Sequence, residues 1–132
     1  IASNNLKQLK KDGYDIRSFV KIPVRSTPLG LVLEVETDLG KLDLSLDSGT
    51  TCTIVKASLL GNEKPEEVAY GLPKIKSKKF QIGGQNFKDV NMFFYDFSDK
   101  MKGIDGIIGV DFLQRYPMYI DFAKEVVYIK VD

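Results

Sequence analysis

The stretch Asp47-Ser48-Gly49 carries the residue types in this sequence that are best suited to acid–base chemistry. It follows directly on alternating leucines at positions 42, 44 and 46, so the acid stands where a strand ends. Two carboxylates held about 3 Å apart cannot both ionise, so one can take a proton from water while the other donates to a carbonyl. The alternative interpretation is turn chemistry, because Asp, Ser and Gly are also common where strands close into turns.

Other reactive side chains are few. The sequence has no histidine, so a Ser-His or Cys-His nucleophile pair cannot form within this chain, and the usual transition-metal ligand is missing. Cys52 is the only cysteine, and we interpret it as a small buried or cleft-lining residue because no histidine can activate it. It cannot form an intramolecular disulfide, so the cysteine content does not indicate whether the protein works in an oxidising or a reducing compartment. The glycine-rich stretch 103–109 lacks the Gly-Lys-Ser/Thr ending of a phosphate-binding loop.

Three further charged features have structural interpretations. Asp111 comes near the start of a predicted short helix, where a negative charge suits the helix N-terminus. Asp105 lies between Gly103 and Gly106 and is interpreted as a loop residue. The lysines within 74–79 are interpreted as a solvated strand edge, with a surface for acidic substrates or nucleic acid as the alternative.

The composition is that of an ordinary globular domain. The chain has 132 residues, 43% hydrophobic and 28% charged, which suits one domain with a core of its own. A net charge of +1 gives no broad field to attract nucleic acid or anionic lipid, and no stretch approaches the roughly 20 apolar residues of a membrane span. The first residue is Ile1 rather than Met, which indicates a processed protein or an excised piece of one.

Alternation of apolar and polar residues predicts the strands that must position Asp47. Residues 18–25 read as a strand with Pro23 at a sheet edge, and 31–37 and 41–47 form a hairpin around the turn 38–40. A short strand at 52–55 follows.

The second half of the chain is also predicted to consist mainly of short strands. We expect a mostly irregular segment over 59–74, a hairpin over 78–95 around Gly83-Gly84 and a buried strand at 106–109. Two helical turns over 110–116 end at Pro117, and a last hairpin joins 118–122 to 125–131. Seven or eight strands and one or two short helices predict a mainly β barrel or sandwich.

Two stretches together resemble the retropepsin-like aspartic proteases, single-lobe relatives of pepsin that act as homodimers. They are "LVLEVETDLGKLDLSLDSGTT" (31–51) and "GIDGIIGVDFLQRYPMYIDF" (103–122). The resemblance covers about residues 18–132 and leaves 1–17 as a polar N-terminal extension. The pattern is most like bacterial exported members and the eukaryotic DNA-damage-inducible relatives, which favours an exported or periplasmic location.

The resemblance implies an all-β, retropepsin-like lobe, a closed barrel or sandwich, that acts as an aspartic endopeptidase on polypeptides. A water molecule activated between two Asp47 carboxylates of a homodimer would hydrolyse the peptide bond, without metal, cofactor, nucleic acid or membrane span. Asp47 would be catalytic, with the turn supported by Ser48, Gly49 and Thr50. The residues expected to line the substrate cleft are Thr51, Cys52, Gly71, Leu72, Ile107 and Ile108.

Family members also close a β-hairpin flap over the substrate. The candidate is 68–79, with Gly71-Leu72-Pro73 at its tip, and it is short and basic on its return side. Two alternatives stay open: a catalytically inactive interaction module of the same fold, or one lobe of a longer two-lobe protein.

Overall fold

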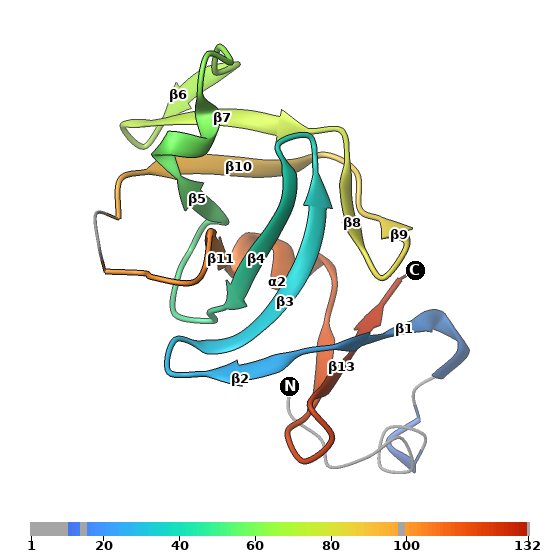
Figure 1. Cartoon of the computed structure of the whole chain (residues 1–132). Coiled ribbons are helices and arrows are strands. Elements are labelled where there is room, and N and C mark those ends of the chain that lie inside the picture. The colour runs from blue at the N-terminus through green and yellow to red at the C-terminus, as the bar shows by residue number, and fades with distance from the viewer. Residues whose placement is uncertain (1–10, 14–15, 98–99, 132) are drawn as a thin grey trace.

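The computed structural model describes residues 11–13, 16–97 and 100–131. Of the expected extension, residues 1–17, the described part consists of residues 11–13 and the first two residues of the short 3-10 helix η1 (Ile16–Ser18). The described residues form thirteen strands in two sheets (Figure 1). None of the helices among them is long and apolar enough to cross a membrane.

The larger sheet has ten strands and runs from β6 at one edge to β9 at the other, with β2 paired to β3 beside this path. Its strands are β2 (Arg25–Thr27), β3 (Gly30–Thr37), β4 (Gly40–Leu46), β5 (Ile54–Lys56), β6 (Glu67–Ala69), β7 (Leu72–Ser77), β8 (Phe80–Ile82), β9 (Gln85–Asn86), β10 (Val90–Tyr95) and β11 (Gly106–Ile108). The smaller sheet has the order β1-β13-β12, made of β1 (Phe19–Pro23), β13 (Val126–Lys130) and β12 (Met118–Asp121). The helices η2 (Ala57–Leu60) and α2 (Val110–Arg115) lie between strands.

The β3–β4 hairpin forms where the sequence predicts it, because its residues alternate between apolar and polar. Leu42 and Leu44 are buried, while Asp43 between them is half-buried, the period of two expected when one face packs on a core. Gly40 follows the turn with a φ of 106°, which glycine adopts without steric cost. The hairpin delivers the end of β4, and Asp47 after it, to one end of the sheet.

The position of β11 is the central feature of the larger sheet. β4 and β5 follow one another along the chain, but β11 lies between them, parallel to β4 and antiparallel to β5. This close approach depends on glycine, because a Cβ on Gly106 would lie 2.2 Å from the carbonyl oxygen of Ile54. The connecting residues 47–53, which we call the Asp47 loop, therefore pass around the end of β11.

The main hydrophobic core lies on one face of the larger sheet and is closed by α2 and the smaller sheet. The ring centroid of Phe112, from α2, lies 5.5 Å from that of Phe80 and 5.3 Å from that of Phe87. Ile129 of β13 is fully buried in the same cluster. Both sheets and the helix share this core, which fixes the frame around the Asp47 loop.

The mainly β architecture is confirmed, as are the edge strand containing Pro23, the helix ahead of Pro117 and the C-terminal hairpin β12–β13. Within the described residues the larger sheet is an open path from β6 to β9 rather than a closed barrel.

Two predicted connections are wrong in part. The segment 59–74 is not mostly irregular, because β6 pairs with β7 in a hairpin. In the stretch 78–95 only β8 and β9 pair around Gly83-Gly84, and β10 pairs instead with β7 and β5. Short strands gain much of their stability from neighbouring strands, so local patterns specify their pairing poorly.

Candidate active site

Asp47 lies directly after β4, where the chain turns away from β11. Its N–H donates to the carbonyl oxygen of Ile108 at 3.0 Å, and the N–H of Thr50 donates to the carbonyl oxygen of Asp47 at 3.3 Å. Asp47 is half-buried, whereas Ser48 and Gly49 are exposed. The turn therefore presents a carboxylate from a fixed backbone at the surface of the chain.

Both oxygens of the Asp47 carboxylate accept a hydrogen bond from the turn itself. The N–H of Gly49 donates to Oδ1 at 2.8 Å, and the hydroxyl of Thr50 donates to Oδ2 at 2.8 Å. A Cβ at position 49 would stand 3.2 Å from Oδ1, which is tighter than an ordinary contact. These bonds orient the carboxylate, and each oxygen keeps a lone pair that can accept a proton or a water hydrogen.

The rest of the Asp47 loop is bonded to the start of α2. The N–H of Val110 donates to the carbonyl oxygen of Thr50 at 2.8 Å, and the N–H of Asp111 donates to that of Thr51 at 3.0 Å. Gly109 permits this contact, since a Cβ there would lie 2.4 Å from the carbonyl oxygen of Cys52. The predicted site residues 47–52 and 107–109 are thus brought together by strand pairing and by these bonds.

Asp111 does more than the sequence suggests. As expected it serves the helix start, because Oδ1 accepts the N–H of Phe112 at 2.8 Å. It also accepts the hydroxyl of Thr53 at 2.8 Å and the N–H of Thr53 at 3.1 Å. The Thr53 oxygen accepts the N–H of Gly109 at 3.2 Å, and Thr53 is fully buried. Sequence reasoning missed Thr53, because nothing in a short "CTIV" strand distinguishes a hydroxyl that bridges two segments.

Cys52 is half-buried in the Asp47 loop. Burial, and secondarily the Asp111 carboxylate, raise the pKa of its thiol above the ordinary value. The thiol is therefore held in its protonated form, which is not the nucleophilic one.

Beside this loop, the face of the larger sheet opposite the core carries a row of apolar residues. The strand register pairs Ile107 with Ile54, and Ile54 in turn with Phe93. Directly paired residues point to the same face of a sheet. Ile107 and Phe93 are buried, yet neither belongs to the core clusters. Ile108 is fully buried in the main core, so of the two isoleucines expected to line a cleft only Ile107 faces this side.

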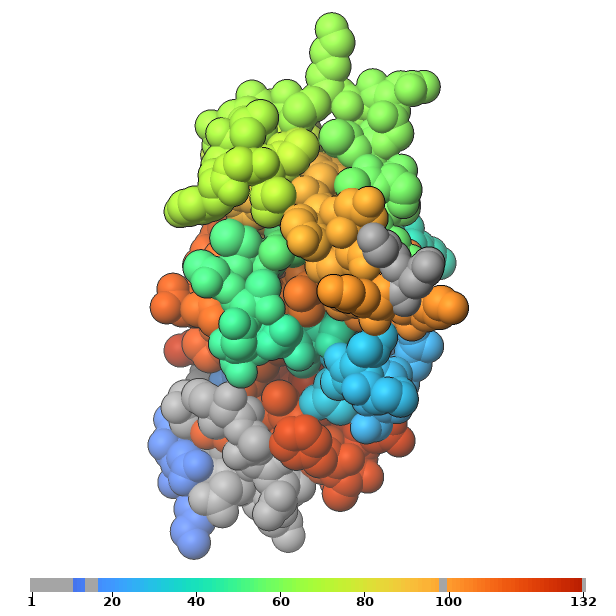
Figure 2. Space-filling model, turned by 90° about the vertical axis from the view of Figure 1, so that its left-hand side faces the viewer, coloured from blue at the N-terminus to red at the C-terminus, as the bar shows by residue number. Residues whose placement is uncertain are grey.

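The β6–β7 hairpin is present where a flap is expected, but its tip is different. The turn consists of Tyr70-Gly71, whereas Leu72 and Pro73 of the expected tip belong to β7. Both turn residues have positive φ, 55° and 76°, as in a two-residue type I′ turn. Tyr70 is 87% exposed, with its ring centroid 6.0 Å from that of Phe93. Figure 2 shows the hairpin in yellow-green above the blue-green segment around residue 47.

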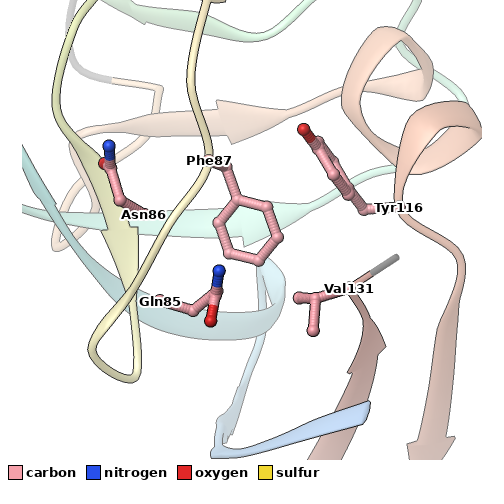
Figure 3. Close-up of a pocket in the computed structure, with 5 residues that line it drawn as sticks. All are labelled: Gln85, Asn86, Phe87, Tyr116 and Val131. Carbon is pink, nitrogen blue, oxygen red and sulfur yellow. The ribbon is translucent and has the colours of Figure 1, made fainter. Parts of the chain in front are cut away.

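A separate pocket of about 290 Å³ lies between β9, the end of α2 and residue 131 (Figure 3). Its lining consists of Gln85, Asn86, Phe87, Tyr116 and Val131. None of these five side chains is a carboxylate, an amine or a thiol, so this pocket offers little for the chemistry considered above. The described residues also contain no group of three or more His, Cys, Asp or Glu side chains placed to hold a metal ion.

Neither a protein-family model nor a curated protein matches the sequence. Solved structures do match. A retropepsin-like aspartic protease from Rickettsia conorii is similar with a TM-score of 0.60 and 18% sequence identity, over 84% of this chain and 90% of that chain. The retroviral protease-like domain of Ddi1 from Leishmania major is similar with a TM-score of 0.58 and 15% identity, over 80% of this chain and 93% of that chain. At such identities the likeness is one of fold, and the chain has a retropepsin-like fold.

Proposed function

We propose that residues 18–132 form an aspartic endopeptidase domain with Asp47 as the catalytic residue. The observation that carries this proposal is the Asp47 carboxylate itself, oriented by the Gly49 N–H and the Thr50 hydroxyl on an otherwise exposed turn. The retropepsin-like fold, whose matched structures are an aspartic protease and a protease-like domain, supports the same class of reaction.

The reaction is peptide-bond hydrolysis by water. One Asp47 carboxylate takes a proton from water, whose oxygen attacks the peptide carbon, while the second, protonated Asp47 donates its proton to the carbonyl oxygen. Collapse of the tetrahedral intermediate breaks the C–N bond, and the amine leaves with a proton from the dyad. No covalent bond to the enzyme forms.

This scheme requires two chains, because the sequence contains one Asp-Ser-Gly turn. Ser48, Gly49 and Thr51 are exposed and accessible to a second copy. In the homodimer we assign Ser48 to hydrogen bonding between the two turns. We assign the lining of the substrate cleft to Thr51, Cys52, Gly71, Leu72 and Ile107.

The test is cleavage of an unfolded protein across pH 3–7 by the chain and by its Asp47→Asn variant. We expect cleavage by the former and a loss of about 10³-fold or more in the variant, the range that acid–base catalysis supplies. Sedimentation at the same concentration should show a dimer for both. Equal cleavage by the two proteins would refute the assignment of Asp47.

A second candidate is a catalytically silent binding module of the same fold. The short hairpin favours it, because β6 has only three residues to cover a peptide. This candidate gains if a dimer forms and binds unfolded peptides but neither protein cleaves them. A chain that remains monomeric would instead favour one lobe of a longer two-lobe protein.

A further inference from the structure

We propose that Lys74 is a specificity-determining residue that selects peptides with an acidic side chain near the cleaved bond. This inference rests on the proposed function, since it assigns the substrate class of the same site. It begins with the apolar row Ile107–Ile54–Phe93, which the strand register extends by one more strand to Lys74 of β7. The row therefore starts beside the Asp47 loop and ends at an ammonium group.

The surroundings of Lys74 hold the ammonium on this face. Its Nζ lies 6.0 Å from the ring centroid of Phe93, within the range of a cation–π contact. The Lys74 side chain is only 14% exposed. Because the end of the row combines an apolar floor with a nearly buried cation, it is complementary to an anionic group that arrives with apolar neighbours.

Lys74 already has a carboxylate partner, and that partner is the replaceable member of the pair. Glu67 forms the ion pair from β6, a three-residue strand at the edge of the sheet, and its side chain is 54% exposed. A lysine ammonium has three donors, and the exposed carboxylate can move into water at little cost. A substrate carboxylate can therefore displace or join Glu67, whereas a neutral amide of the same shape loses the charge attraction.

The geometry also limits where the acid sits in the peptide. From β11 to β7 there are three steps between neighbouring strands (Figure 1), a span of about 14 Å at about 4.8 Å per step. An extended peptide covers this distance in about four residues. The acidic side chain is therefore expected within about four residues of the bond placed at Asp47.

The experiment uses synthetic ten-residue peptides with an apolar centre, in which each outer position in turn carries Glu or the matched Gln. Binding is measured by fluorescence anisotropy to the dimer of the Asp47→Asn protein, and cleavage is measured with the unsubstituted protein. The variants are Lys74→Gln, Lys74→Arg and Glu67→Gln. The matched control is Lys76→Gln, because Lys76 is an exposed lysine two residues along the same strand.

We expect the Glu peptide to bind about tenfold tighter than its Gln match at one or two positions, the effect of one charge-assisted hydrogen bond. Lys74→Gln should remove this preference, Lys74→Arg should keep it, Lys76→Gln should leave it unchanged, and Glu67→Gln should increase it. A preference that survives Lys74→Gln, falls equally in Lys76→Gln, or is absent at every position would overturn the inference, as would failure of all peptides to bind. Preferential binding without cleavage would support the role of Lys74 and refute the protease assignment. Cleavage without a preference for Glu peptides would support the protease assignment and refute the role of Lys74.

Discussion

The Asp47 loop and the β6–β7 hairpin both lie on the molecular face of Figure 2, but they are held in different ways. The loop is bonded to β11 and α2 through main-chain groups and through the carboxylate of Asp111, while the carboxylate of Asp47 is bonded within the loop. The hairpin is paired on one side only, by β7 to β10, and adds the Lys74–Glu67 ion pair and the Tyr70–Phe93 ring contact. Residues 61–66, which lead into it, and the first two residues of β6 are all exposed.

The two regions are therefore suited to different tasks in the proposed site: one holds the reacting group and the other covers the peptide. A reacting group must be held within a fraction of an ångström, which needs buried, fully bonded support. A segment that admits and covers a peptide must instead come from the part of the structure with few buried contacts. The Asp47 loop is closely packed and bonded, whereas the hairpin has few contacts that would prevent it from rearranging.

The largest effect is expected where the loop meets α2. In Gly109→Ala the new Cβ would lie 2.4 Å from the Cys52 carbonyl oxygen and 2.7 Å from that of Thr50, both backbone atoms that cannot move freely. We expect the free energy of unfolding in urea to fall by about 3 kcal/mol. Gly71→Ala in the hairpin tip is the control, because no atom lies within 4 Å of its Cβ position. It should lose only the cost of a positive φ, about 1 kcal/mol. Equal losses of stability in the two variants would contradict the claim that the Asp47 loop is more closely packed than the hairpin.

The second prediction concerns the buried Thr53 hydroxyl. Thr53→Val keeps the shape but removes one of the two hydrogen bonds that Asp111 Oδ1 accepts, and it leaves the Gly109 N–H without the Thr53 oxygen as its acceptor. Unfolding measurements should show a loss of about 1–3 kcal/mol, together with reduced cleavage because the loop is less well fixed. Thr53→Ser retains the hydroxyl and should lose clearly less stability. If valine is tolerated as well as serine, the hydroxyl bridge does not support the loop.

A smaller change, of opposite sign, is expected at the hairpin tip. Tyr70 has a φ of 55°, which is unfavourable for a bulky residue, whereas Asn followed by Gly is the preferred pair for this type of turn. Tyr70→Asn should therefore raise the free energy of unfolding by about 0.5–1 kcal/mol, measured at fixed protein concentration. A loss of stability would show that the contact with Phe93 outweighs the backbone strain.

The smallest expected effect is a difference in thiol reactivity between the Asp47 loop and the hairpin. Since the thiolate is the reactive form and the Cys52 pKa is raised, less thiolate is present at pH 8 than for an ordinary cysteine. Alkylation of Cys52 by iodoacetamide should be several-fold slower than in a Val68→Cys, Cys52→Ser double variant, where the thiol is on the exposed hairpin. Its rate should also continue to rise at pH values where the hairpin thiol has reached its plateau. Equal rates and profiles would contradict the burial of Cys52.

Much of the fold could be predicted because its signals are local. The alternation of leucines from 42 to 46 and the glycine at position 40 predict a hairpin that ends at Asp47, whatever the rest of the chain does. Pro23 predicts an edge, and Pro117 predicts the end of a helix, because each lacks an N–H donor. Each of these elements is observed in the expected place.

The hairpin over 67–77 was not predictable in the same way. Its two strands carry little alternation, and two glycines and two prolines nearby favour an irregular interpretation. β7 is an ordered strand because β10 supplies its hydrogen-bonding partner, and β10 lies there because β5 pairs with its other edge. Such pairings join residues far apart in sequence, so no local pattern specifies them.

The groups available for chemistry follow from the amino-acid sequence alone: one Asp-Ser-Gly turn, one cysteine, no histidine, and strands whose period of two separates a core face from an outer face. How those groups are placed relative to one another depends on contacts between distant parts of the chain. Insertion of β11 between β4 and β5 brings Asp111 to Thr53 and aligns Ile107 with the row that ends at Lys74. Composition and alternation are properties of neighbouring residues, whereas these contacts exist because the whole sheet buries its apolar face around one core.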